Sequence, residues 1–250
     1  MYIPPKLTKR EIEIIPLLVS GATRSDMAKH FKLSEETIKL HVRKILRKFD
    51  ATSLRDCIFE ITQYYEQFIQ GSHSFFIPHL SSTAHVWGNQ ACRDIETEFD
   101  IVAINQNVDE ISESYAANAP IEGVWINGAL IAPQTELYGT KFTWTFPETL
   151  APYQRTHIST RARFVSGTPE NIENHYNKIV DPTGHFSFGV VFHSDNVPDT
   201  VHFSAMRSIG GEIPIEKIFR PSPQEFRIEI SRPEYLRRYR IRWVWNAQMC

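Results

Sequence analysis

Residues 34–49 read SEETIKLHVRKILRKF, and this stretch decides how the first part of the chain folds. At about 100° per residue, a helix gathers its apolar side chains into one stripe. Here the stripe consists of Ile38, Val42, Ile45 and Phe49. The opposite arc carries Leu40 and five basic residues that we expect to have no acidic neighbour: Lys39, Arg43, Lys44, Arg47 and Lys48. One face of this helix is therefore expected to pack against a core, and the other to lie in a groove of DNA.

The flanking residues predict three further helices. Each of the four expected helices begins with an N-capping residue: Thr8, Thr23, Ser34 or Ser53. Three of these residues are followed three positions later by an acid, which is the pattern of a capping box. Only Lys32 and Leu33 separate the helix of residues 23–31 from the basic helix. So short a connection predicts a helix-turn-helix whose second helix reads DNA.

These residues resemble a known family, the LuxR-type (GerE-like) helix-turn-helix domain of bacterial transcription regulators. The residues that carry the resemblance are Leu7-Thr8, Arg10-Glu11, Gly21, Thr23, Ala28, Leu33-Ser34, Thr37-Ile38-Lys39, His41, Ile45, Lys48-Phe49 and Arg55. The resemblance covers about the first quarter of the chain. It implies that Lys39, Leu40 and Arg43 reach base edges in the major groove. It also implies that Thr23, Thr37 and Lys48 lie near the phosphate backbone.

The chain departs from the family pattern in three ways. Pro16 lies inside the first expected helix, where it removes one backbone hydrogen bond and should kink the helix. Arg24 and Ser25 stand where the family usually has an Asn-Lys pair. The family also usually places this domain behind a sensor or receiver domain, whereas here it precedes the rest of the chain.

The charge on the basic helix admits a simpler interpretation, because a charged arc often only faces solvent. Here the charge has one sign and coincides with the reading helix, so we expect DNA contact. Arg24, Lys44, Arg47 and Lys48 are expected to attract phosphates. For His41, the sequence leaves open whether it faces phosphate or is a structural histidine.

Composition sets limits on the class of protein. Residues 1–65 contain 12 basic and 8 acidic residues, a net charge of +4, and the remaining residues contain 15 and 21, a net charge of −6. Cys57, Cys92 and Cys250 are too few and too scattered for a disulfide framework, which favours the cytoplasm. No apolar run approaches the ~18 residues that a membrane span needs, and no signal peptide is recognisable. We therefore expect a cytoplasmic protein without membrane contact.

The last helix of the first domain is expected to be long. Its apolar pattern continues from Ser53 through Phe68 and ends at Gly71-Ser72. The excess length is either a rigid connector or a dimer contact. We favour the dimer, because in the resembling family this helix commonly pairs across a two-fold axis, and a two-fold dimer matches a palindromic DNA site.

Beyond residue 73, alternating apolar residues predict strands at 142–146, 158–164, 186–192, 201–205, 226–230 and 239–245. Phe192 is expected to pair with Phe203 in a hairpin that places His193 opposite His202. Short helices are expected near 109–117 and 169–177. The predicted fold is thus a multi-domain α+β chain. A four-helix LuxR-type domain at residues 1–70 is followed by a mainly antiparallel, β-sandwich-like domain at residues 73–250.

The strand-rich domain shows no recognisable catalytic signature, and we recognise no family for it. His193, His202, Asp195 and Asp199 are ligand types that metals accept, but they more often lie on the solvent side of a hairpin, so no metal is predicted. A basic strip would form if the strands that carry the following arginines adjoined: Arg161, Arg163, Arg227, Arg240 and Arg242.

The sequence thus predicts a dimeric transcription regulator that binds double-stranded DNA, is not an enzyme and has no cofactor. The strand-rich domain would hold the dimer, touch a protein partner or sense a small molecule, with the last ranked slightly lower. Two alternatives stay open. The helix-turn-helix could be fused to an enzymatic or ligand-binding domain, or serve as a protein-docking module.

Overall fold

The computed structural model describes residues 4–71, 73–87, 92–104, 106–116, 121–136, 139–164, 174–193, 197–207, 217–219, 224–233 and 237–244. The chain divides into two compact units. Tyr2–Ser74 with Ile104–Gln106 form the helical unit, and Phe75–Ala103 with Asn107–Cys250 form the β unit. The prediction of helices followed by a strand-rich region is confirmed.

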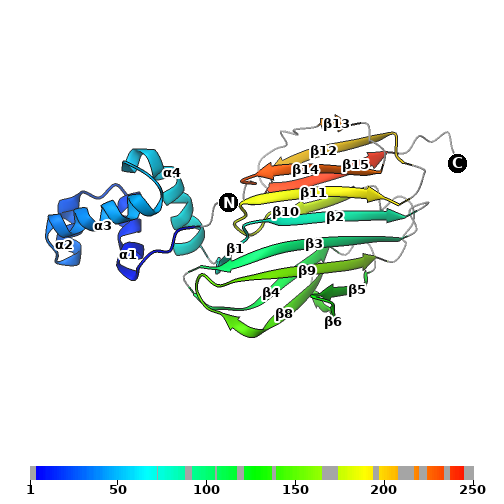
Figure 1. The fold of residues 1–250 in the computed structure, drawn as a ribbon, viewed down its shortest axis with the longest axis horizontal. Helices are drawn as coiled ribbons and strands as arrows, with labels where there is room; N and C mark the ends of the chain where they lie inside the picture. The colour runs from blue at the N-terminus through cyan, green and yellow to red at the C-terminus, as the bar shows by residue number, and fades with distance from the viewer. Residues whose placement is uncertain are drawn as a thin grey trace. The chain divides into compact units, whose positions relative to one another are not determined.

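The helical unit contains four α-helices and a short π-helical segment (Figure 1): α1 (Lys9–Val19), α2 (Arg24–Phe31), α3 (Glu35–Lys48), α4 (Leu54–Tyr64) and η1 (Tyr65–Ile69). The four predicted capping residues cap these helices, and Thr8, Thr23 and Ser53 each form a complete capping box. Lys32 ends α2 in the left-handed conformation (φ 53°, ψ 46°), and Ser34 then caps α3. Local signals therefore fix the helix-turn-helix.

The helices enclose a small apolar core. The side chains of Ile14, Ile15, Ile38, Ile45 and Ile61 are fully buried. Phe49, at the end of the apolar stripe of α3, is half-buried and meets Tyr64 edge to face, with ring centroids 5.8 Å apart. Helix α1 continues through Pro16 to Val19. None of the helices in the described part of the chain is long and apolar enough to cross a membrane.

The described strands of the β unit form three sheets (Figure 1). The large sheet has the strand order β14 (Glu225–Ser231), β11 (His185–Phe192), β2 (Leu80–Trp87), β3 (Cys92–Ala103), β9 (Arg155–Phe164), β5 (Ile121–Ile126) and β6 (Ala129–Ile131), with β1 (Phe75–Phe76) paired to β3. The second sheet has the order β10 (Asn174–Lys178), β15 (Arg237–Val244), β12 (Thr200–Arg207) and β13 (Lys217–Phe219). The third consists of β4 (Val108–Ala116), β8 (Gly139–Leu150) and β7 (Gln134–Glu136).

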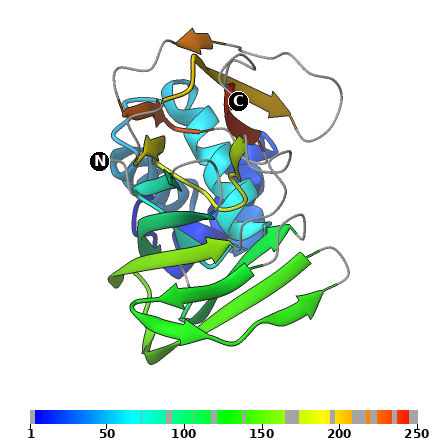
Figure 2. The same cartoon turned by 90° about the vertical axis from the view of Figure 1, so that its right-hand side faces the viewer.

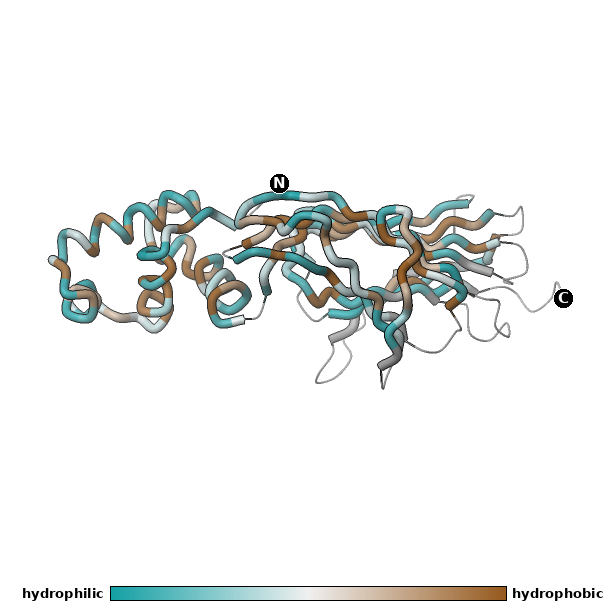
Figure 3. Tube along the Cα trace, turned by 90° about the horizontal axis from the view of Figure 1, so that it is seen from below, coloured by the Kyte–Doolittle hydropathy of each residue, from teal (hydrophilic) through white to brown (hydrophobic). Residues whose placement is uncertain are grey.

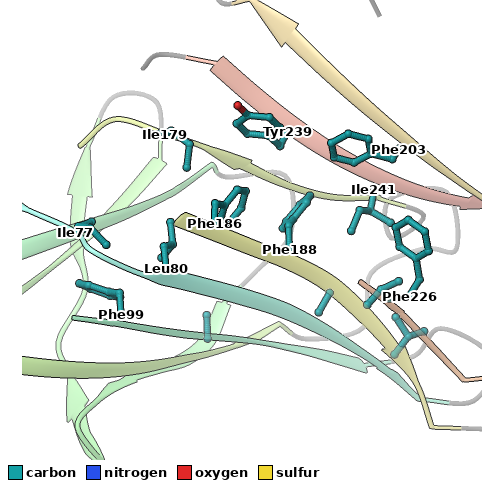
Figure 4. Close-up of a cluster of buried hydrophobic side chains, with 14 of the residues drawn as sticks. Ile77, Leu80, Phe99, Ile179, Phe186, Phe188, Phe203, Phe226, Tyr239 and Ile241 are labelled. Atoms are coloured by element: carbon teal, nitrogen blue, oxygen red, sulfur yellow. The ribbon is translucent and has the colours of Figure 1, made fainter. Parts of the chain in front are cut away.

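The core of the β unit lies on one face of the large sheet. Phe186 and Phe188 of β11 are fully buried there (Figure 4), and Phe186 packs against Tyr239 of β15 with ring centroids 5.6 Å apart. Ile111 of β4 and Phe142 of β8 belong to the same buried cluster. Both small sheets therefore cover the same face of the large sheet.

The two small sheets lie at different ends of the β unit: β12 and β13 are at the opposite end from β8 in two perpendicular views (Figures 1 and 2). Along many strands the hydropathy alternates between neighbouring residues (Figure 3), as expected where one face of a strand is buried. Most pairs between described strands are antiparallel, and β2 and β11 form a parallel pair.

The predicted hairpin of Phe192 with Phe203 is wrong. Strand β11 pairs with β2 and β14 in the large sheet, whereas β12 pairs with β13 and β15 in the second sheet. Both phenylalanines are buried, so the inward face of each strand was predicted correctly. The alternation within a strand fixes which side faces the core, but it does not fix the pairing partner.

The predicted helix near 109–117 is also wrong, because Val108–Ala116 form β4, which pairs with β8. Ile111 is buried and Ser112 and Ser114 are exposed, so the burial follows a period of two. Of the predicted helix near 169–177, residues 174–177 lie in β10, and residues 169–173 lie outside the described residues. The six predicted strands fall within β8, β9, β11, β12, β14 and β15, with residue 245 outside the described residues.

Candidate nucleic-acid interface

Helix α3 presents an apolar face and a basic face, as its sequence predicts. Ile38, Val42 and Ile45 are buried in the core of the helical unit. Leu40 has 51% of its surface exposed and lies on the basic face. Arg43, Lys44 and Arg47 are exposed beside it. An exposed leucine among cations suits contact with thymine methyl groups and phosphates.

Two of the five basic residues have acidic neighbours, so the expectation that none of them does is wrong. Lys39 Nζ lies 3.0 Å from Glu36 Oε1, and Lys48 Nζ lies 2.6 Å from Glu11 Oε2. Glu36 precedes Lys39 by three residues and therefore shares its side of the helix. Within the part of the chain that the structure describes, Arg43, Lys44 and Arg47 form no ion pair. These three carry the uncompensated charge of α3.

The ion pair of Lys48 joins α3 to the start of α1. Glu11 has only 2% of its surface exposed, and it also accepts a hydrogen bond from the backbone nitrogen of Thr8 at 2.7 Å. Burial alone would raise the pKa of Glu11, but the hydrogen bonds from Lys48 and Thr8 outweigh this effect and hold the pKa below its ordinary value. Lys48 therefore also has a structural role, which the sequence did not reveal.

The remaining predicted DNA-contacting residues lie around the same turn. Thr23 and Arg24 are exposed at the start of α2, and Thr37 and His41 are half-buried on α3. The hydroxyl of Thr23 lies 2.6 Å from Asp26 Oδ2, and that of Thr37 lies 2.8 Å from the hydroxyl of Ser34. Both threonines thus help to cap helices.

Arg24 of α2 lies near Lys39 and Arg43 of α3, although the chain separates them. The three residues line one pocket of about 410 Å³, whose apolar walls include Met27 and Val42. Three cations around one hollow are the kind of arrangement that attracts an anion such as a phosphate group. That the ten residues predicted to bind DNA do contact it stays a prediction.

The condition for a basic strip in the β unit is not met, because the strands that carry these arginines do not adjoin. Strands β9 and β14 are separated in the large sheet by β3, β2 and β11, and β15 belongs to the second sheet. Arg161 and Arg163 both bind the buried carboxylate of Asp94. Burial would raise the pKa of Asp94, but the two arginines hold it below its ordinary value. These arginines compensate an acid and are not available as a free cationic strip.

The predicted hairpin would have placed His193 opposite His202, but the two residues belong to strands of different sheets or to their ends. His193 follows β11, where its Nε2 lies 2.8 Å from Nδ1 of His85, and its ring stacks on Trp87 with centroids 4.3 Å apart. His202 lies on β12, and Asp195 lies outside the described residues. Among the residues whose positions are described, no group of three or more His, Cys, Asp or Glu could hold a metal ion.

A row of buried polar residues in the β unit escaped the sequence analysis. Ser82, Thr97 and Thr160 lie on the apolar face of the large sheet and are paired directly across β2, β3 and β9. His175 of β10 covers this row and is buried as well. The signal in the sequence is weak: Thr160 falls between Ile158 and Ala162 at a position where the alternation calls for an apolar residue.

Comparison with known proteins identifies the class of the helical unit. Residues 5–60 match the family of bacterial regulatory proteins of the LuxR type (GerE). This part of the chain is therefore a LuxR-family helix-turn-helix domain, as the resemblance predicted. Over 47 residues the chain is 36% identical to the nitrate/nitrite response regulator protein NarP of Escherichia coli (strain K12). That match covers 19% of this chain and spans 22% of NarP.

Solved structures resemble the chain only distantly. The M1 zinc metallopeptidase from Deinococcus radiodurans is 11% identical, with a TM-score of 0.39, over 69% of this chain and 43% of that protein. Yeast LTA4 hydrolase is 12% identical, with a TM-score of 0.39, over 67% of this chain and 28% of that protein. A likeness at this TM-score does not define a shared fold or function.

Proposed function

We propose that this protein is a DNA-binding transcription regulator that reads the major groove with α3. The observation that carries the proposal is the exposed arc of Leu40, Arg43, Lys44 and Arg47 on α3, the second helix of the helix-turn-helix in a LuxR-family domain. The opposite face of α3 is buried, so the helix has one orientation in which its exposed arc enters a groove. The 47-residue match to the response regulator protein NarP supports the proposal.

Different residues would supply specificity and general affinity. Lys39, Leu40 and Arg43 read base edges, and Arg43 suits a guanine because a guanidinium donates two hydrogen bonds to O6 and N7. Thr23, Arg24, Thr37 and His41 contact the phosphate backbone around the start of α2 and α3. Lys44, Arg47 and Lys48 attract phosphates and make binding sensitive to salt.

The protein would act as a homodimer paired through α4. Phe59 has 66% and Ile58 has 37% of its surface exposed on this helix, which leaves adjacent apolar side chains for a partner to cover. A two-fold pair of α4 helices would place two α3 helices on half-sites about one DNA turn apart.

The β unit, as a sandwich-like domain, would regulate or assemble the complex without being an enzyme. No converging polar group was visible in the sequence, so small-molecule sensing ranked below dimerisation and partner binding. The buried polar row of the β unit reverses this ranking, and we place small-molecule sensing first. We expect a regulator of this kind to act in the cytoplasm.

The test is selection of bound fragments from a random double-stranded DNA library with the purified full-length protein. The proposal predicts one enriched palindromic motif, which Arg43→Ala loses at particular positions. Arg55→Ala, an exposed arginine on α4, is the matched control and should recover the same motif as the wild type. Failure of the wild type to enrich any sequence would contradict the proposal and favour the protein-docking alternative.

A further inference from the structure

Ser82 and Thr97 of the polar row lie at the bottom of a pocket inside the β unit, which His175 and Glu113 also line. Ser82 Oγ is 3.1 Å from His175 Nε2 and 3.4 Å from Thr97 Oγ1. At the far end of the row, the hydroxyl of Thr160 donates to Glu113 Oε2 at 3.4 Å. The side chains of Ser82, Thr97 and His175 are 1%, 6% and 3% exposed. One continuous polar strip therefore crosses an otherwise apolar face, with an imidazole at one end and a carboxylate at the other.

The pocket above this strip has a volume of about 480 Å³. Its walls come from β4 on one side and from β10 on the other, and its floor comes from β2 and β3. Ile77, Leu80, Phe99 and Ile179, which lie around the same space in Figure 4, supply much of its apolar lining. An apolar cavity of this size with a few converging polar groups is typical of a small-molecule site.

Stability alone would favour apolar residues at the positions of the polar strip. Neighbouring rows of the same face are apolar: Leu80 pairs with Phe99, and Ala84 with Ile95. A buried hydroxyl costs free energy unless it is hydrogen-bonded, whereas an apolar side chain of the same shape carries no such requirement. Polar residues that interrupt a core in this way are expected where function requires them.

The hydrogen-bonding groups and charges of the pocket indicate which class of ligand it binds. Glu113 is acceptor-only when ionised, and the hydroxyl and imidazole groups also offer acceptor atoms. The charged residues that line the pocket are Glu113, Lys178 and Asp181, so acids outnumber bases. We infer that this pocket binds a small organic amine, with its apolar body between β4 and β10 and its amino group donating hydrogen bonds to Glu113 and the polar strip.

This inference deepens the proposed function, since the amine would be the signal that the regulator senses. The test is isothermal titration calorimetry on the full-length protein without DNA, so DNA binding does not influence the result. Three probes share one ring system and differ in the head group: tryptamine is an amine, tryptophol an alcohol and indole-3-acetate an acid. We expect tryptamine to bind about tenfold more tightly than tryptophol, because its hydrogen bond to a carboxylate is charge-assisted. Indole-3-acetate should bind most weakly.

Substitutions assign the binding to this pocket. Glu113→Gln should lower the affinity for tryptamine about tenfold and remove its advantage over tryptophol. Glu110→Gln makes the same chemical change on the same strand, three residues away and exposed, and should leave the affinity unchanged. Thr97→Val removes one hydroxyl without changing the shape of the side chain. It should weaken tryptamine binding several-fold while the thermal midpoint of the free protein stays the same or rises.

Circular dichroism establishes that each variant is folded, and Thr97→Val serves as the test if Glu113→Gln does not fold. The inference is overturned if none of the probes binds, if indole-3-acetate binds as tightly as tryptamine, or if a folded Glu113→Gln or Thr97→Val variant binds tryptamine like the wild type. Binding of tryptamine by a protein that enriches no DNA sequence would refute the proposed function and leave the pocket assignment standing.

Discussion

Lys48 Nζ of α3 donates a hydrogen bond to Glu11 Oε2 of α1 at 2.6 Å, across 37 residues of sequence. The same carboxylate closes the capping box at the start of α1. One cation of the basic helix is thus used to hold that helix against the rest of its domain. Loss of either partner should affect the stability of the helical unit before it affects DNA contact.

Glu11→Gln should lower the stability of the helical unit at neutral pH by about 1–3 kcal/mol, because a buried, charge-assisted contact is lost. The pKa of Glu11 is lowered by folding, so its contribution is present above the ordinary carboxyl pKa of about 4.3. That contribution is lost as the pH falls through the lower pKa of the folded state. Urea unfolding followed by the helical circular dichroism signal should therefore depend less steeply on acid pH in the variant. Glu13→Gln, on the exposed side of α1, is the control, and equal behaviour of the two variants would refute this account.

Arg43→Ala should cost about 1–3 kcal/mol of binding free energy at the selected DNA site and relax specificity at one or two base pairs. The reason is the loss of hydrogen bonds to a base edge, which a non-specific sequence does not provide. Fluorescence anisotropy with matched cognate and scrambled duplexes measures both affinities. A loss of equal size on both duplexes would assign Arg43 to phosphate contact instead.

Arg47→Ala should weaken binding to all DNA sequences and lower the slope of log affinity against log salt by roughly one. Lys48→Ala should lower the slope less, because Glu11 already compensates the charge of Lys48. Affinities measured at several salt concentrations on one duplex distinguish the two variants. Equal slopes for the two variants would show that the ion pair opens when DNA binds.

Phe59→Glu should convert a dimer into a monomer, because it places a charge on the exposed apolar patch of α4. Sedimentation equilibrium on the full-length protein gives the mass directly. Val180→Glu, at an exposed valine of the β unit, is a control for the effect of an added charge on solubility. If the Phe59→Glu variant remains dimeric, the dimer contact does not lie at this patch of α4.

His85, which stacks on His193, should make the β unit sensitive to mild acid. Burial is the main cause that lowers the pKa of His85, and His193 adds to this effect, while Glu96 opposes it. A histidine whose pKa is lowered by folding binds fewer protons when folded, so its contribution to stability is lost as the pH falls below about 6.5. His85→Gln should reduce this pH dependence in thermal unfolding, and His30→Gln, an exposed histidine of the helical unit, should not. An unchanged pH profile in His85→Gln would contradict the assignment.

The helical unit was predictable because its determinants are local. The capping boxes at Thr8, Thr23 and Ser53 each span four residues, and the apolar stripe of α3 recurs within single turns. The Glu36–Lys39 pair was missed, although its spacing of three residues is a local signal. The pair of Glu11 with Lys48 has no local signal in the sequence, since it depends on how two helices pack.

The β unit was less predictable because the pairing of its strands is set by long-range contacts. Phe192 and Phe203 are separated by a short connection that favours a hairpin, yet their strands join different sheets. The polar strip depends on register, which places Ser82, Thr97 and Thr160 side by side although they lie far apart in sequence. The alternation of apolar and polar residues identifies the inward side chains of one strand. The register between strands decides which inward side chains lie side by side.

The most direct test of the central claim is methylation interference at the selected DNA site, with the wild type and Arg43→Ala compared. Guanine N7 lies in the major groove, whereas adenine N3 lies in the minor groove. If α3 reads the major groove, methylation of particular guanines at N7 should block binding of the wild type. Binding of Arg43→Ala should become indifferent to at least one of these guanines. Interference confined to adenine N3, or an identical pattern for both proteins, would contradict the assignment of α3 as the reading helix.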